Sequence, residues 1–272
     1  HLSDAVYHSE GLTINGQLVG RYLLYRAVRQ AGYKVVLTGE GADEVFLGYA
    51  HLQRDFGGPQ PDDPTQAGIM LPGPDAPALP QVQSRLGHVP SFLSAKVAMC
   101  QPLHALLDDD LRHALTQRDM VAELLDGFRL DVLRPLHAVE QSAWLWTRLA
   151  LAGYILRTLS DGAEMASSVE GRPPFLDHHL YELARSLPVQ SKMNKLALRD
   201  ALKTVLPEPI RTRPKHPFLA PPITPHRVRD RLAAGVPFFN TKRVLAWLEA
   251  APSDPALHLL LSIQAVQDRL LS

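Results

Sequence analysis

Three carboxylates follow a short apolar run in this chain, and two glycines flank the first of them. The run Val-Val-Leu leads into Glu40, Asp43 and Glu44, with Gly39 and Gly41 on either side of Glu40. A short β-branched run that ends at glycine is typical of a buried central parallel strand. Glycines let the backbone turn sharply and approach a ligand closely. Because ligands of open α/β sheets collect at the carboxyl ends of strands, the pattern predicts a ligand site at this turn.

Two of these carboxylates have a simpler explanation. Asp43 and Glu44 fall in the first turn of a predicted helix, where acidic side chains stabilise the helix dipole. Spacing alone does not separate that role from ligand binding. Glu40 precedes the helix, at a position where no capping role needs a glutamate. Glu40 is therefore the strongest candidate for chemistry.

Three stretches of the chain closely resemble the synthetase domain of the glutamine-dependent asparagine synthetases. They are Leu-Thr-Gly-Glu-Gly-Ala-Asp-Glu at 37–44 with Phe46, Gly48 and Tyr49; Asp161, Met165 and residues 168–178; and Arg-Pro-Lys at 213–215 with Phe218. Their order and approximate spacing agree with the family, and residues 260–264 resemble its last helix. The resemblance covers nearly the whole chain apart from a proline-rich insertion.

The resemblance implies ATP-dependent amide formation through an acyl-adenylate, with ATP and Mg²⁺ as cofactors and AMP and pyrophosphate as products. Glu40 matches the residue that takes the proton when the amine attacks the adenylate. Lys215 matches the lysine that stabilises charge on the adenylate and the departing pyrophosphate, although a loop lysine is ordinarily just solvated.

The same resemblance assigns the residues around Glu40. Asp43 would bind Mg²⁺ together with an aspartate from the family's phosphate loop, and Glu44 would lie near the same pyrophosphate. Thr38 and Gly39 match positions whose backbone contacts the nucleotide. Without the family match, Thr38 and Gly39 are simply residues of a strand-ending turn.

Two parts of the family pattern are missing from this sequence. Relatives carry a glutaminase domain that opens with a catalytic cysteine, and a phosphate loop of the form Ser-Gly-Gly-x-Asp-Ser. Here the single cysteine, Cys100, lies mid-chain, and no glycine-rich phosphate loop precedes Glu40. Because the first residue is His1, we expect a processed piece, a split-gene subunit or an excerpt. The glutaminase and phosphate-loop portion should be a separate chain or a removed N-terminal part.

Composition narrows the class of partner. The 272 residues are 46% hydrophobic, enough to bury a core, and 28 basic residues balance 28 acidic ones. This balance predicts neither nucleic acid nor membrane as partner. The family resemblance, rather than composition, implies a small-molecule acid as substrate. Arg148 and Arg157 interrupt the best candidate for a membrane span. A single cysteine, Cys100, is typical of a protein of the reducing cytoplasm, and we expect its side chain to be a small buried hydrophobe. The sequence leaves open whether the chain forms a homo-oligomer.

The predicted fold class is α/β. Residues 1–55 are expected to end a parallel-sheet nucleotide-binding domain of the adenine nucleotide alpha-hydrolase-like type, and residues 91–272 to form the helical part of the same synthetase domain. Residues 56–90 are rich in Pro, Gly, Asp and Gln and predict a flexible loop. Residues 144–159 are apolar almost all round, which predicts a buried helix. Its aromatic residues, among them Trp146, could line a substrate pocket, but core packing is the preferred interpretation.

The second stretch carries two further candidates. We expect Arg172 and Asp177 to hold it together through a charge-assisted hydrogen bond. The adjacent His178 and His179 cannot place both rings on one face, so no zinc site is predicted.

The main hypothesis is an asparagine synthetase-like ligase that uses glutamine-derived ammonia on aspartate or a related acid. The identity of the acid substrate is left open by departures from the family pattern. They include Gly171, Pro217 and the missing basic residue after Asp161. A specialised ligase of the β-lactam or lasso-peptide type is one alternative. Tyr7 lies roughly where the assisting tyrosine of β-lactam-forming relatives could be, but its place at a predicted helix start favours a structural role. A non-catalytic scaffold subunit is the other.

Overall fold

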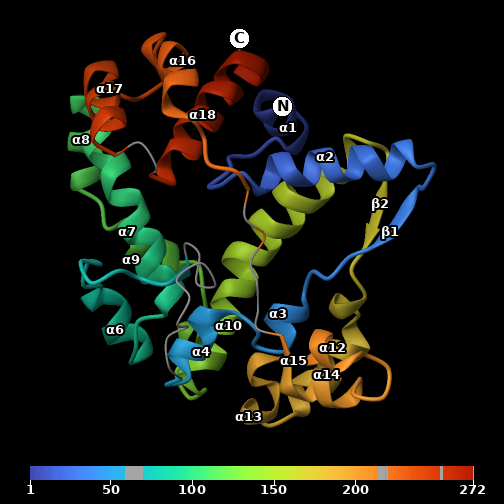
Figure 1. Ribbon diagram of the computed structural model, residues 1–272. Coiled ribbons are helices and arrows are strands. Elements are labelled where there is room, and N and C mark those ends of the chain that lie inside the picture. Colours follow the sequence, from blue (N-terminus) through green and yellow to red (C-terminus); the bar gives the residue numbers. More distant parts are fainter. Residues whose placement is uncertain (59–69, 214–217, 219, 252–253, 272) are drawn as a thin grey trace.

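The computed structural model describes residues 1–58, 70–213, 218, 220–251 and 254–271. The fold is mostly helical with one small parallel sheet (Figure 1). The N-terminal part comprises α1 (Leu2–Ser9), α2 (Gln17–Gln30), β1 (Val35–Leu37), α3 (Ala42–Val45) and α4 (Ala50–Asp55). The middle part comprises α6 (Pro80–Leu86), α7 (Ser91–Leu106), α8 (Asp109–Thr116), α9 (Met120–Asp126), η2 (Leu130–Val132), α10 (Ala138–Trp146), η3 (Thr147–Asp161) and α11 (Gly162–Met165). The rest comprises β2 (Glu170–Arg172), η4 (Pro174–Leu176), α12 (His178–Ser186), α13 (Val189–Lys192), η5 (Met193–Lys195), α14 (Leu196–Ala201), α15 (Glu208–Thr212), η6 (Pro225–Arg227), α16 (Arg229–Ala233), α17 (Thr241–Ala250), α18 (Ala256–Val266) and η7 (Gln267–Leu271).

The predicted strand forms and is parallel, but it is not buried. β1 pairs with β2 in the register Val36↔Gly171. Val35 is 41% exposed and Leu37 73% exposed. Their side chains point to the same face of the strand, and that face is exposed at the margin of the molecule, where β1 and β2 lie (Figure 1). In the described part of the chain the sheet has two strands. The expectation of a buried central strand is wrong for the chain as described.

A long helical segment runs through the middle of the molecule, from α10 through η3 into α11 (Figure 1). The backbone stays in the right-handed helical region where α10 meets η3 at Thr147. Burial along it is one-sided: Trp146 and Leu159 are buried, whereas Gly153 and Arg157 are exposed. The prediction of a helix at 144–159 is confirmed, but its burial on all sides is not.

Two expectations from the middle of the chain are corrected. Within the predicted loop 56–90, α6 is a helix with proline at its first position, where the missing N–H costs nothing. Its residues Val82 and Leu86 are buried in the core, which stabilises the helix. Residues 59–69 of the same stretch lie outside the described ranges. Cys100 is exposed on α7 rather than buried, because its side of that helix faces away from the core.

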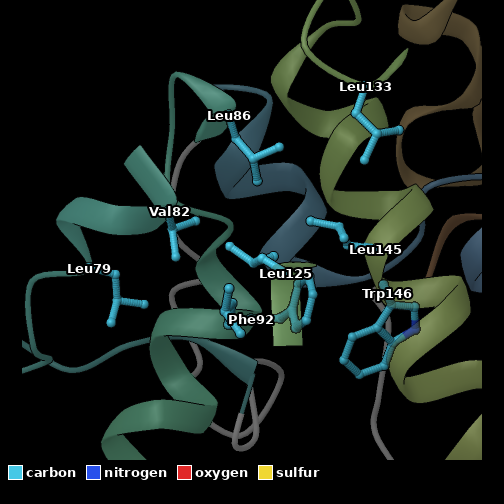
Figure 2. Packing of buried hydrophobic residues seen from close by; sticks show 9 residues of the cluster. Leu79, Val82, Leu86, Phe92, Leu125, Leu133, Leu145 and Trp146 are labelled. Atoms are coloured by element: carbon cyan, nitrogen blue, oxygen red, sulfur yellow. The ribbon is translucent and has the colours of Figure 1, made fainter. Parts of the chain in front are cut away.

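One hydrophobic cluster joins the middle helices to the end of α10 (Figure 2). Its buried members are Leu79, Val82, Leu86, Phe92, Leu93, Leu125, Leu133, Leu145 and Trp146. A second cluster packs α1, α2 and the end of η3 around Val6, Leu18 and Leu159. These two clusters hold α2 and the α10–η3 segment in place, and the turn after β1 lies between them. Within the described ranges, no helix has both the length and the hydropathy of a membrane span.

Candidate active site

The turn after β1 is built by glycines. Gly41 has a φ of +91° and begins α3, whose first bond runs from the Val45 N–H to the Gly41 carbonyl at 2.8 Å. A Cβ at Gly41 would lie 2.3 Å from Leu176 Cδ2, so both the backbone angle and the space require glycine here. The close approach of η4 to this turn therefore places the second motif stretch against the first.

The turn forms one wall of a cavity of about 500 Å³. Its described lining comes from the start of α2, the turn and α3, the α10–η3 segment, and single residues of α7 and the later chain. The lining residues are Ile14, Asn15, Gly16, Gln17, Arg21, Gly39, Glu40, Gly41, Asp43, Glu44, Tyr49, Ala50, Met70, Lys96, Trp146, Ala150, Tyr154, Ile155, Leu159, Phe218, Ala220, Pro221, Pro222, Pro255 and His258. Four residues predicted from sequence, Gly39, Glu40, Asp43 and Glu44, thus share one cavity.

Glu40 forms an ion pair with Arg21 of α2. Its side chain is 9% exposed, and Arg21 Nη1 also donates to Ser160 Oγ at 3.1 Å. Burial acts to raise the pKa of Glu40, but the Arg21 charge and a hydrogen bond from Thr38 outweigh it, so the pKa lies below the ordinary value. Glu40 is consequently ionised at neutral pH and able to accept a proton.

Asp43 is paired with Lys195, whose Nζ lies 2.9 Å from Asp43 Oδ1. The backbone N–H of Lys195 donates to the Phe46 carbonyl at 2.9 Å, which anchors the end of η5 beside α3. Gly48 makes room for the pair, since a Cβ there would lie 2.3 Å from Asp43 Oδ1 and 2.4 Å from Lys195 Cε. The site thus includes a lysine from a distant part of the chain.

Glu44 is held by two aromatic donors. Its Oε1 accepts from the Tyr49 hydroxyl at 2.9 Å and from Trp146 Nε1 at 3.1 Å. The side chain is buried, and burial raises its pKa above the ordinary 4.5 despite those two hydrogen bonds. A buried carboxyl with two donors on one oxygen fixes the position of Trp146 in the cavity wall.

The raised pKa of Glu44 predicts a pH-dependent contribution to stability. A carboxyl whose folded pKa exceeds its unfolded value stabilises the fold fully below pH 4.5, and this contribution is lost as pH rises through the folded pKa. The free energy of unfolding of the wild type, minus that of Glu44→Gln, should therefore fall as pH rises above 4.5. Urea unfolding from pH 4.5 to 8 measures it.

Glu170→Gln is the matched control for that series. Glu170 is exposed, and its hydrogen bond with Arg172 lowers its pKa, so its difference should be flat above pH 4.5. A Glu44 difference that is flat, or that rises with pH, contradicts the assignment of a raised pKa.

Comparison with known proteins shows the family of this chain. The family model described as asparagine synthase matches residues 1–258. The chain belongs to the asparagine synthase family. Its relatives include "Amidase chyE" of Penicillium rubens, 29% identical over 80% of this chain and 37% of the relative. "Amidase chry2" of Gibberella zeae is 28% identical over 80% of this chain and 36% of the relative. "Asparagine synthetase [glutamine-hydrolyzing] 3" of Bacillus subtilis is 28% identical over 84% of this chain and 31% of the relative.

The chain spans about a third of the length of these curated relatives. No solved structure matches it. Membership of the asparagine synthase family confirms the resemblance drawn from the three sequence stretches.

The other predicted residues of the asparagine synthase site have different outcomes. Thr38 donates its backbone N–H to the Arg172 carbonyl at 3.0 Å, so the sheet already uses that donor. Gly39 is exposed and lines the cavity. Lys215 lies outside the described residues. The nucleotide contacts of Thr38, Gly39 and Glu44 and the role of Lys215 stay predictions.

A Mg²⁺ ion of the kind that ATP-dependent ligases use could take one ligand from this wall. Within the described ranges, no cluster of three or more His, Cys, Asp or Glu residues could hold a metal by itself. Mg²⁺ is usually bound by one or two carboxylates together with phosphate oxygens and water. Asp43, an acidic residue of the cavity lining, fits that partial role.

Two residues of the second stretch, Arg172 and Asp177, are placed differently from the sequence expectation, whereas Tyr7 has the helical position that was preferred for it. Arg172 pairs with Glu170 at 2.7 Å, and Asp177 instead caps α12 by accepting from the backbone of His179 and Leu180. The prediction of a hydrogen bond between Arg172 and Asp177 is wrong, because each of the two side chains has a partner nearer in sequence. Tyr7 lies on α1 beside Arg269 and does not belong to the described cavity lining.

Arg21 and Lys195 are site residues that sequence reasoning missed, and Trp146, for which core packing was preferred to pocket lining, does both. Each lies far along the chain from the residue it contacts, and none stands in a motif stretch. Gly171, which departs from the family pattern, has a structural explanation. A Cβ at Gly171 would lie 2.2 Å from the buried Glu164 carboxylate. Glu164 also accepts from the Gly171 N–H at 2.9 Å.

Proposed function

We propose that this chain forms part of an ATP-dependent, amide-forming ligase of the asparagine synthetase type. The observation that carries the proposal is that Glu40, held by Arg21, and Asp43, paired with Lys195, line the same cavity. A carboxylate that can accept a proton thus lies near a charged pair suited to a phosphate site. The family supports ATP as the co-substrate.

The proposed chemistry has two steps. In the first, a carboxylate oxygen of the acid attacks the α-phosphorus of ATP, the bond from that phosphorus to the bridging oxygen breaks, and pyrophosphate leaves. In the second, the amine nitrogen attacks the acyl carbon, the bond to AMP breaks, and Glu40 takes the proton that the nitrogen loses. Bound Mg²⁺ would offset phosphate charge, with Asp43 as one ligand. Lys195, and Lys215 by family resemblance, would offset the remaining charge.

A nucleotide-binding sheet of the adenine nucleotide alpha-hydrolase-like type needs more strands than the two described here. β1 has one strand neighbour among the described residues, and the side chains of Val35 and Leu37 are exposed, which supports a partner that extends the sheet and covers this face. We propose that the glutaminase and phosphate-loop portion, as a separate chain or as an N-terminal part of the same one, completes the sheet there. Ammonia from glutamine would then reach the acyl-adenylate from that portion.

Aspartate, as in asparagine biosynthesis, is the first acid to test, but the cavity supports a second candidate. Part of its wall is apolar, because Trp146, Ile155 and Leu159 belong to the lining together with the charged turn. Two relatives carry the name amidase rather than asparagine synthetase. A specialised ligase that acts on an acid with an apolar body is therefore the alternative. A non-catalytic scaffold would have no reason to keep Glu40 and Asp43 on one cavity wall.

An acid-dependent exchange assay tests the proposal. The chain, together with the phosphate-loop portion, is incubated with ATP, labelled pyrophosphate and a panel of acids that runs from l-aspartate to aromatic acids. Label should enter ATP with at least one acid, and ammonium should convert that acid to its amide. A complex that assembles but exchanges no label with any acid contradicts the ligase and favours the scaffold.

A further inference from the structure

The cavity wall around the turn poses an electrostatic problem for an acid substrate. Glu40, Asp43 and Glu44 all line it, so a carboxylate that approaches this wall meets acidic side chains. In the proposed reaction the acyl carbon must nevertheless come within reach of Glu40, which takes the proton of the attacking amine. A cation on this wall is needed to bring the two carboxylates together.

Two cations belong to the described lining, Arg21 and Lys96. Lys96 comes from α7, and burial lowers its pKa to about 8. Lys195 is already paired with Asp43. Arg21 instead contacts Glu40 directly, so it is the described cation placed beside the residue that the acyl carbon must reach.

The hydrogen bonds of Arg21 leave part of its guanidinium for a ligand. Both of its contacts with described residues, to Glu40 and to Ser160, use the same nitrogen, Nη1. A guanidinium carries five N–H donors in a planar fork that matches a carboxylate in two-point geometry. Within the described ranges, Nη2 and Nε of Arg21 form no such contact.

We propose that Arg21 binds the reacting carboxylate of the acid substrate beside Glu40 and is thereby a specificity-determining residue for carboxylic acids. Arg21 bridges the substrate carboxylate and Glu40, and Ser160 fixes the guanidinium from the η3 side. This inference rests on the proposed ligase function and deepens it. No sequence motif pointed to Arg21, which stands on α2 outside the three family stretches.

The test measures acid-dependent exchange of pyrophosphate into ATP, a reaction that precedes the amine step. The acid of the panel that supports most exchange in the wild type serves as the probe. Arg21→Gln should raise the KM for that acid by about 10- to 100-fold, the effect of losing a charge-assisted pair, with the KM for ATP within about twofold. Arg21→Lys should recover part of the loss, because it keeps the charge but not the fork.

Arg26→Gln is the matched control, since Arg26 is exposed on the same helix and does not belong to the described cavity lining. Its kinetics should equal the wild type. Because Arg21→Gln leaves Glu40 buried without its cation, the double variant Arg21→Gln/Glu40→Gln is compared with Glu40→Gln alone. The acid KM should still rise in the double variant.

The outcomes separate the two proposals. An unchanged acid KM in Arg21→Gln, with amide formation alone impaired, overturns the substrate role and leaves Arg21 as a positioning residue for Glu40. A rise in the KM for ATP as large as that for the acid overturns it as well. Absence of exchange in the wild type with every acid contradicts the ligase itself, and with it the role of Arg21.

Discussion

Replacing Glu40 by glutamine is expected to reduce amide formation by about 10²- to 10⁴-fold, the usual contribution of a general base. Glutamine keeps the shape of the side chain and can still accept a hydrogen bond from Arg21, but it cannot take a proton. The amine step should therefore fail, while acid-dependent exchange of pyrophosphate persists within a few-fold. Amide is quantified by mass spectrometry with ammonium as the donor, alongside the exchange assay.

Glu170→Gln serves as the control for this loss, because Glu170 is an exposed carboxylate on β2 that pairs with Arg172. It should leave both amide formation and exchange unchanged. If Glu40→Gln instead abolishes exchange and amide formation equally, Glu40 acts in adenylation or in the structure of the turn rather than as the base of the second step.

Asp43→Asn should produce the second large effect, a fall in pyrophosphate exchange on the order of 10²- to 10³-fold. The substitution weakens the carboxylate that would hold Mg²⁺, and it leaves the Lys195 ammonium, 2.9 Å away, without its counter-charge. Both changes affect the adenylation step, in which pyrophosphate leaves, so the loss should appear already in the pyrophosphate exchange assay. Raising Mg²⁺ should recover part of the activity, because the remaining metal site is weakened rather than removed.

Asp200→Asn is the control on the helix that follows Lys195, since Asp200 is exposed on α14. Urea unfolding of both variants separates a catalytic defect from a folding defect. Normal exchange in Asp43→Asn at limiting Mg²⁺ would rule out the metal role and leave Asp43 as the structural partner of Lys195.

Local sequence was sufficient for the elements whose formation depends on neighbours along the chain. The strand Val35–Leu37 and the turn at Gly41 form where the pattern predicts them. Burial was predicted less well, because it depends on what packs against an element. The apolar composition of β1 indicated a covered strand, yet Leu37 is 73% exposed. Composition also concealed α6, whose apolar residues Val82 and Leu86 are held by the core and not by helix propensity.

The sequence by itself determined the family and one wall of the cavity. Glu40, Asp43 and Glu44 stand within five residues of one another, so a single turn and the start of α3 bring them to the same surface without help from the rest of the fold. Only the tertiary structure decided their partners. Arg21 on α2, Trp146 at the end of α10 and Lys195 beside α14 reach those carboxylates because separate hydrophobic clusters fix the helices around the turn. The opposite pKa shifts of Glu40 and Glu44 follow from these long-range contacts and from burial, which no local pattern encodes.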